Sequence, residues 1–373
     1  MKDRVRRILE LVSPKADALL IANSTDPHLD GSFFYAFDVP GGLFEGSVAV
    51  GLPDGKLHVL SSPLEEESAV QAAKRDPAVD IHVATPATKE GILREVLKGH
   101  AKADATFAVN FHEITHEAFL ALQKTFPEAK WVDATAAIRK ARGVKDAGEI
   151  ERIQEAARIG STVAREIPSM LTAGMTEIAL AAQMEYRMMQ LGASGRSFAT
   201  IVGFGANSAE PHYAPQKVKL VPGQSMVCDF GAYFQRYACD ITRSFHFGPR
   251  DDELKRVHET VYAAQQAALA VLGPGVAGQD VHAAAQKVVD ASPWKGRFTH
   301  GLGHALGLAV HDAGVGLYPG AEDKLEPGMV VTVEPGIYLP GHGGVRIEDD
   351  VVITKDGYKF LTTAPREYLE VSA

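Results

Sequence analysis

Two carboxylic acids follow directly on apolar segments that have the composition of buried β-strands. Asp229 comes after Met226–Cys228, and Glu334 comes after Val330–Val333. A carboxylate in such a place needs a partner, because burying an unpaired charge is costly. The fold must therefore bring a counter-charge to the ends of both strands.

A third acid, Asp240, lies eleven residues after Asp229. On one continuous strand this odd separation would place the two side chains on opposite faces. A hairpin with its turn near Phe234-Gln235 would instead place them opposite each other on one face, with Cβ atoms about 4.5–5.5 Å apart. Two carboxylates that close repel each other unless a proton or a cation lies between them.

A histidine and a fourth acid complete the group. His304 lies in the glycine-flanked segment His300–His304, and Glu348 lies in Arg346-Ile347-Glu348. The chain has 47 Asp and Glu residues, so any one acid is more simply interpreted as a surface residue, and the prediction depends on the whole set. Four carboxylates and one imidazole favour Mn²⁺, with Co²⁺ or Zn²⁺ as substitutes. Two such ions roughly 3.5–4 Å apart would hold a bridging water and lower its pKa.

The organisation along the chain predicts two domains. A length of 373 residues is too great for one ordinary core. Up to about residue 135, helical and strand patterns alternate, which indicates an α/β domain. The polar segment 138–148 predicts a boundary, giving domains 1–140 and 141–373. Beyond it, a long helix, a glycine-containing break, a second helix and β segments occur in 147–246 and again in 252–354, which suggests an internal duplication. The first long helix is expected to end at Pro168.

Composition excludes several classes of function. The formal charge is −9 and no Lys/Arg cluster stands out, so nucleic acid is not an expected partner. No apolar run approaches the roughly 20 residues that span a bilayer, and no apolar stretch follows the basic N-terminus as in a signal peptide. Two cysteines form no disulfide framework. We expect a cytoplasmic protein that does not bind membranes.

The motifs resemble those of the pita-bread metallopeptidases, the family of methionine aminopeptidase, aminopeptidase P and prolidase. The order Asp-x10-Asp, His, Glu, Glu matches, and residues 300–312, 325–338 and 344–350 are similar to the prolidase and aminopeptidase P signature. The match covers residues 147–360, and the preceding part is similar to the creatinase/prolidase N-terminal domain. The resemblance implies an α+β fold, with a pseudo-twofold antiparallel sheet covered by helices in the catalytic domain and a smaller α/β N-terminal domain.

The resemblance also implies five metal ligands. Asp229 would bind one ion and His304 the other. Asp240 and Glu348 would bridge the two ions. Glu334 would be a ligand and also the general acid/base for the bridging water.

Further residues take substrate-related roles by the same resemblance. His212 would contact the substrate, and His311 would stabilise the tetrahedral oxyanion. Arg346 would pair with carboxylates near the metals or with the C-terminus of the substrate. His300 would bind substrate or have a structural role. The chain departs from the family at Phe198, where a tyrosine is usual, which removes one hydroxyl near the metal carboxylates.

The implied reaction is hydrolysis of the peptide bond before proline in small peptides, by a homodimer with two divalent ions. We favour an Xaa-Pro dipeptidase from the compact length and the lack of a C-terminal extension, with Xaa-Pro aminopeptidase as the alternative. A non-catalytic peptide-binding module on the same fold is a second alternative, but it should show eroded ligands. A methionine aminopeptidase would normally lack the N-terminal domain and would carry Glu in place of Asp312.

Overall fold

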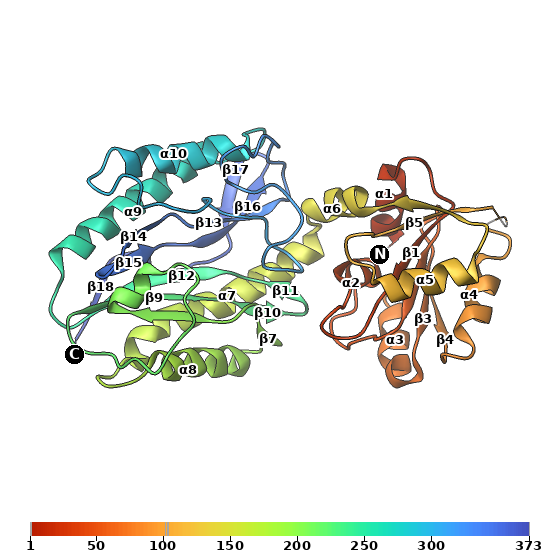
Figure 1. Cartoon of the computed structure of the whole chain (residues 1–373), viewed down its shortest axis with the longest axis horizontal. Coiled ribbons are helices and arrows are strands. Elements are labelled where there is room, and N and C mark those ends of the chain that lie inside the picture. Colours follow the sequence, from red (N-terminus) through yellow and green to blue (C-terminus); the bar gives the residue numbers. More distant parts are fainter. Residues whose placement is uncertain (1, 101, 103, 373) are drawn as a thin grey trace. The chain divides into compact units, whose positions relative to one another are not determined.

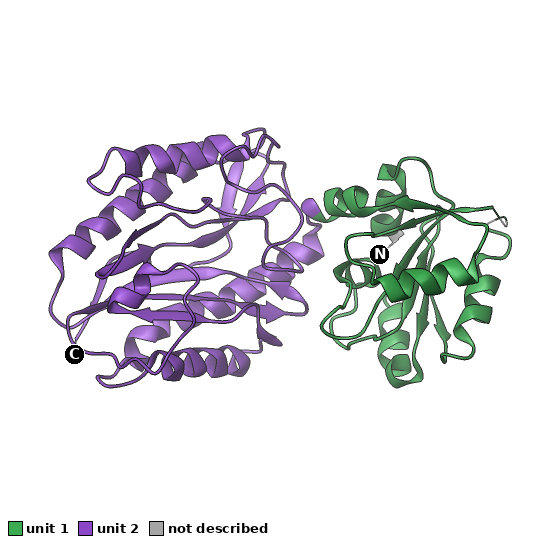
Figure 2. Ribbon diagram, in the orientation of Figure 1, with its two compact units in different colours: residues 1–142 green, residues 143–373 purple. Residues whose placement is uncertain are grey.

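The computed structural model describes residues 2–100, 102 and 104–372, which fall into two compact units, unit 1 (1–142) and unit 2 (143–373) (Figure 2). The segment 138–148, interpreted above as a domain boundary, is helical over most of its length. Helix α6 spans Thr135–Gly143, because Ala137, Ile138 and Ala141 are buried on one of its faces. Arg139 and Lys140 of the same helix are exposed.

Unit 1 is the α/β arrangement that the sequence predicted. Its sheet has the strand order β4-β3-β2-β1-β5-β6, with β1–β2 and β2–β3 antiparallel and the other pairs parallel. The strands are β1 (Ala18–Ala22), β2 (Val48–Gly51), β3 (Leu57–Ser61), β4 (Val79–Val83), β5 (Thr106–Val109) and β6 (Lys130–Asp133). The helices before α6 are α1 (Lys2–Leu11), α2 (Gly31–Phe37), η1 (Pro63–Glu65), α3 (Glu66–Ala73), α4 (Lys89–Leu97) and α5 (His116–Thr125).

Unit 2 shows the same order of elements twice, as the sequence suggested. The first half contains α7 (Ala147–Met170), α8 (Glu177–Gln190), β7 (Gly195–Arg196), β8 (Ile201–Phe204), η2 (Gly205–Ala209), β9 (Gln224–Phe230), β10 (Ala232–Phe234), β11 (Tyr237–Ala238) and β12 (Ile241–Phe247). The second half contains α9 (Asp252–Val271), α10 (Gly278–Asp290), β13 (Val330–Val333), β14 (Gly336–Leu339), β15 (Gly343–Arg346), β16 (Asp349–Thr354) and β17 (Gly357–Phe360), followed by β18 (Leu369–Val371). Helix α7 continues through Pro168 to Met170, so the expected end at Pro168 is wrong.

Two hydrophobic cores fill unit 2. In Figure 1 the strands lie between α7 and α8 on one side and α9 and α10 on the other. Ile153 and Val163 of α7 share one core with Phe230 of β9, and Val261 of α9 shares another with Val333 of β13. The strands β9 and β13, which lead to Asp229 and Glu334, are therefore packed against helices of unit 2.

The hairpin that carries Asp229 and Asp240 differs in register from the expected one. Its turn residues are Gln235 and Arg236, with φ of 45° and 75°, as in a two-residue turn of type I′. This turn lies one residue later than expected, so Asp229 pairs with Thr242 rather than with Asp240. Asp240 precedes Thr242 by two residues and thus lies diagonally from Asp229 on the same face.

Candidate metal centre

A cavity of about 610 Å³ in unit 2 collects the residues that the sequence singled out. They come from the segment between η2 and β9, the end of β9, the residue before β12, the segment before β13, the residue after β13, the end of β15 and the β15–β16 connection. All nine candidate site residues line it: Asp229, Asp240, His304, Glu334, Glu348, His212, His300, His311 and Arg346.

The ligand atoms of three candidates are close enough to share an ion. One ligand atom each from Asp240, His304 and Glu348 lie within 4.8 Å of one another. The Nε2 atom of His304 is 3.6 Å from Oδ2 of Asp240 and 3.4 Å from Oε1 of Glu334. Divalent ions bind such atoms at about 2.0–2.2 Å, so one ion can reach several of them.

Among the described residues that line the cavity, three have a buried carboxylate oxygen without a hydrogen-bond partner. These oxygens are Oδ1 of Asp229, Oδ1 of Asp240 and Oε1 of Glu348. A buried acceptor without a partner is costly, and a cation satisfies it. The donor set thus fits a pair of divalent metal ions.

Electrostatics inside the cavity also favour bound cations. Burial and then the charge of Glu348 raise the pKa of Asp240, and burial and then the charge of Glu334 raise the pKa of Glu348. Burial raises the pKa of Glu334 to about 8. Burial lowers the pKa of His304 to about 4, which keeps its imidazole neutral, the form that binds metals. Positive ions would relieve the repulsion between the carboxylates.

Arg346 is held inside the protein by several acceptors. Its Nη2 donates to Oδ2 of Asp229 and to the carbonyl of Pro211, and its Nη1 donates to Oη of Tyr338 at 2.7 Å. Its Nε donates to Oγ1 of Thr242 at 3.1 Å. The structure therefore places the guanidinium against a metal-ligand candidate, and the side chain is 3% exposed.

Tyr338 and Thr242 form hydrogen bonds with residues that line the cavity, and the sequence analysis did not predict either of them. The Thr242 hydroxyl donates to Oε2 of Glu348 at 2.6 Å. Nδ1 of His300 donates to the Gly301 carbonyl at 2.7 Å, so its Nε2 accepts from the Tyr338 hydroxyl at 2.9 Å. Strand alternation in β12 would have placed Thr242 on the same face as Asp240, and this signal was available in the sequence.

His311 lies beside His304, with ring centroids 4.0 Å apart. The loop that carries it is organised around a buried ion pair, in which Nζ of Lys145 is 3.8 Å from Oδ2 of Asp312. The same Asp312 oxygen accepts from the Leu308 N–H at 3.1 Å. Lys145 belongs to the segment interpreted as the domain boundary, so its contribution was also missed.

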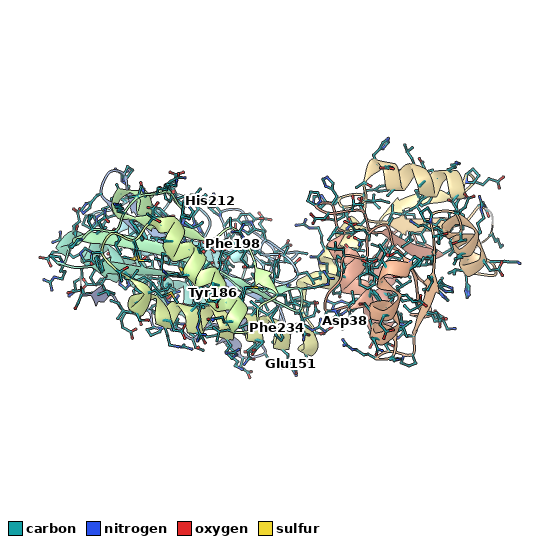
Figure 3. The ribbon with its side chains drawn as sticks, turned by 90° about the horizontal axis from the view of Figure 1, so that it is seen from below. Asp38, Glu151, Tyr186, Phe198, His212 and Phe234 are labelled. Atoms are coloured by element: carbon teal, nitrogen blue, oxygen red, sulfur yellow. The ribbon has the colours of Figure 1, made fainter. Side chains whose placement is uncertain are left out.

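Phe198 lines the cavity together with Ile201 and His212 (Phe198 and His212 are labelled in Figure 3). The ring brings apolar surface to a wall that is otherwise rich in histidine.

Comparison with known proteins gives matches over both units. The sequence model of Metallopeptidase family M24 matches residues 151–355, and that of the Creatinase/Prolidase N-terminal domain matches residues 4–144. A Bacillus subtilis protein named Uncharacterized peptidase YqhT is 37% identical over 258 residues, which cover 69% of this chain and 73% of the relative.

Solved structures resemble the whole chain. The X-Pro aminopeptidase from Thermotoga maritima has a TM-score of 0.89 at 32% identity, covering 99% of this chain and 100% of the other. The Xaa-Pro dipeptidase from Bacillus anthracis has a TM-score of 0.87 at 28% identity, covering 99% and 98%. None of the described helices combines the length and apolarity that crossing a bilayer requires.

Proposed function

Because the chain belongs to metallopeptidase family M24, in its prolidase/aminopeptidase P branch, we propose that it cleaves peptide bonds before proline with two divalent metal ions. The observation that carries the proposal is the set of orphaned buried oxygens on Asp229, Asp240 and Glu348, which converge on one cavity. A binding module without catalysis would not need this set, so we disfavour that alternative.

The side chains that would hold the metal ions are Asp229, Asp240, His304, Glu334 and Glu348. Bound ions would supply a nucleophilic water at neutral pH and polarise the scissile carbonyl. Glu334 would accept the proton of the attacking water and donate it to the leaving nitrogen of proline. The Thr332 hydroxyl, which donates to Oε1 of Glu334 at 3.1 Å, would orient this carboxylate.

The histidines that line the cavity are proposed to hold the peptide. His311 would donate to the developing oxyanion. His212 and His300 would contact the substrate on the other walls. Arg346 would act through Asp229, because its guanidinium orients that carboxylate.

Proline specificity is proposed to come from the apolar part of the wall. Phe198, Ile201, Val310 and Tyr318 line the same cavity. A proline ring is apolar, has a fixed φ and lacks an N–H, so such a wall accepts it without leaving a buried donor unpaired. The names of the two similar structures, an X-Pro aminopeptidase and an Xaa-Pro dipeptidase, support this substrate class.

We favour the dipeptidase, with aminopeptidase P as the second candidate. A dipeptidase must recognise the free C-terminal carboxylate of its substrate. The side chain of Arg346 already donates to Asp229, Tyr338, Thr242 and the Pro211 carbonyl, so in a dipeptidase another group has to bind that carboxylate. In a dipeptidase, the side chain that binds the C-terminal carboxylate of the substrate would then be His212, His300 or His311, which line the cavity.

Three attributes complete the proposal. The ions are Mn²⁺, with Co²⁺ or Zn²⁺ as substitutes, because the donor set is rich in oxygen. The protein acts as a homodimer, which light scattering tests directly. It acts in the cytoplasm on small proline-containing peptides, without nucleic acid or membrane partners, and cell fractionation checks the location.

Product analysis after Mn²⁺ loading tests the function, with Ala-Pro and Ala-Pro-Ala offered side by side and Ala-Ala as the control. Cleavage of Ala-Pro alone identifies a dipeptidase, whereas cleavage of Ala-Pro-Ala with slow or absent turnover of Ala-Pro identifies an aminopeptidase. Activity that survives EDTA, or equal turnover of Ala-Ala and Ala-Pro, would refute the proposal. The Asp240→Asn variant should be inactive with both proline peptides.

A further inference from the structure

A buried glutamate outside the metal centre accepts four hydrogen bonds. Glu177, the first residue of α8, has no exposed surface. Its Oε1 accepts from the Phe204 N–H at 2.8 Å and from Nδ2 of Asn207 at 2.9 Å. Its Oε2 accepts from the Tyr213 hydroxyl at 3.0 Å and from the Gln216 N–H at 2.9 Å. A carboxylate is purely an acceptor, so it suits four converging donors.

All four donors belong to one segment, residues 204–216, here called the His212 loop. The donors lie at its first residue, in its middle and at its last residue. Nδ2 of Asn207 also donates to Oη of Tyr213 at 2.8 Å, which links the two side chains that contact Glu177. Apart from η2 the segment is irregular, so no continuous ladder of backbone hydrogen bonds fixes its course. Glu177 therefore supplies much of what determines the shape of this loop.

The loop reaches the cavity on its other side. Pro211 and His212 line the cavity. The Pro211 carbonyl accepts from Nη2 of Arg346 at 3.4 Å, and Oγ of Ser208 accepts from the Gly344 N–H at 2.8 Å. The loop is thus held between Glu177 on one side and β15 on the other.

The imidazole of His212 has no hydrogen-bond partner among the described residues, and His212 directly precedes Tyr213, one of the Glu177 donors. Its position over the cavity is accordingly set by the backbone of the loop rather than by partners of its own ring. Loss of the Glu177 contacts would let His212 move while leaving the metal ligands in place, because those ligands lie on other segments.

We propose that Glu177 is a positioning residue that holds His212 in place for substrate binding, an inference that rests on the proposed function for the role of His212. In Glu177→Gln an amide nitrogen replaces one acceptor oxygen and faces two of the four donors. The loop then loses its anchor, and the peptide meets a mobile imidazole. The effect falls on KM, because the ions and Glu334 keep their geometry.

Kinetics of the Mn²⁺-loaded protein on its better proline peptide test this. We expect Glu177→Gln to lower kcat/KM at least tenfold, mainly through KM, with Mn²⁺ affinity within twofold of the wild type. Tyr213→Phe, which removes one donor, should change KM in the same direction by a few-fold. The matched control is Glu166→Gln, which breaks the more exposed ion pair with Arg187 and should change neither constant.

A double-mutant cycle separates positioning from a general structural role. If Glu177 acts through His212, Glu177→Gln should lower kcat/KM less than twofold in a His212→Ala background. The proposal is wrong if the two substitutions lower kcat/KM by independent factors that multiply in the double variant. It is also wrong if Glu177→Gln lowers the affinity for Mn²⁺ by the same factor as kcat/KM. Should Glu177→Gln not fold, Tyr213→Phe carries the same cycle.

If the wild type hydrolyses neither peptide, the proposed function is refuted. Hydrogen exchange still tests whether Glu177 holds the His212 loop, because it does not depend on activity. In Glu177→Gln, peptides that cover residues 204–216 should exchange at least tenfold faster, including the amides of Phe204 and Gln216. Peptides from β12 should exchange as in the wild type. Unchanged exchange in the loop would show that Glu177 does not hold it.

Discussion

Removal of the metal ions should make the stability of the protein depend on pH in a way that the buried carboxylates determine. The pKa of Glu334 is raised to about 8 in the folded chain by burial, against 4.5 for an exposed glutamate. In metal-free protein the folded state keeps this proton up to about pH 8, whereas the unfolded chain releases it above about pH 4.5. Stability must therefore fall as pH rises through this window.

The magnitude follows from the difference between the two pKa values. A rise from 4.5 to about 8 corresponds to on the order of 5 kcal/mol for Glu334, taken as an upper bound, because one pKa unit is 1.36 kcal/mol. The raised pKa values of Asp240 and Glu348 act in the same direction. With roughly 2–4 °C per kcal/mol for a domain of this size, the melting temperature of unit 2 should fall by about 5–10 °C between pH 6 and pH 8.

Two buried histidines oppose the carboxylates on the acid side of the profile. Burial lowers the pKa of His300 and of His304 to about 4, against 6.5 for exposed histidine. Between about pH 6.5 and pH 4 the unfolded chain takes up protons on these histidines that the folded chain refuses, which costs stability as pH falls. The histidines therefore offset part of what the protonated carboxylates contribute, and the profile should flatten in this range.

Thermal unfolding after dialysis against EDTA, at half-unit steps from pH 5 to pH 8.5, measures this profile. Added Mn²⁺ should raise the melting temperature more at pH 8 than at pH 6, because it replaces the missing protons. Asp240→Asn removes one charge, so this variant should lose less stability towards pH 8 without metal and gain little from Mn²⁺. A metal-free melting temperature that stays constant or rises from pH 6 to pH 8 would refute the reasoning.

Three substitutions test other parts of the structure. Arg346→Lys keeps the positive charge, but an ammonium cannot donate to Asp229 and Tyr338 with the geometry of a guanidinium. In steady-state assays, kcat/KM on the better proline peptide should fall by about 10²–10³. An unchanged kcat/KM would contradict this interpretation of the geometry. Gly160→Ala places a Cβ 3.0 Å from Sγ of Cys239, and this overpacking should cost about 1–3 kcal/mol in urea unfolding. Thr176→Ala removes the hydroxyl that caps α8 through the Ala179 N–H, and should cost about 0.5–2 kcal/mol in the same assay.

The sequence predicted the order of elements well because the relevant signals are local. Apolar runs, glycine breaks and capping residues such as Thr176 are readable within a few positions, and the segments around them became strands and helices. The acids at the ends of β9 and β13 were visible for the same reason. Their convergence on one cavity was predicted by the repulsion argument and by the resemblance together.

The register of the ligand hairpin was not predictable in the same way. Gln235 and Arg236 both have positive φ, a conformation that Gly, Asn and Asp adopt more readily. The residue types therefore gave no indication of the turn position, and the pairing of Asp229 was misplaced by two residues. Helix α6 was missed because a short amphipathic helix and a polar linker have similar composition.

Groups that support the site were missed because their partners are distant in sequence. Thr242 contacts Glu348 across 106 positions. Lys145 contacts the Ala313 carbonyl across 168 positions. No local pattern encodes such pairs, since they arise from how the two halves of unit 2 pack.

The duplicated architecture explains why the site needs cations. Asp229 and Asp240 belong to the first half of unit 2, and Glu334 and Glu348 belong to the second, so each half brings two carboxylates to the other. Neutral and charged hydrogen bonds join β12 to the second half, among them Oγ1 of Thr242 to Glu348 and Nη2 of Arg243 to Asp349 at 2.8 Å.

These hydrogen bonds bring the two pairs of acids together against their mutual repulsion, with burial adding a desolvation cost. In the proposed metal centre, the attraction between the divalent ions and the four carboxylates would act across both halves at once. Ion binding and the docking of the two halves must therefore stabilise each other, so a substitution that loosens the β12 contacts should weaken metal affinity even where no ligand is changed.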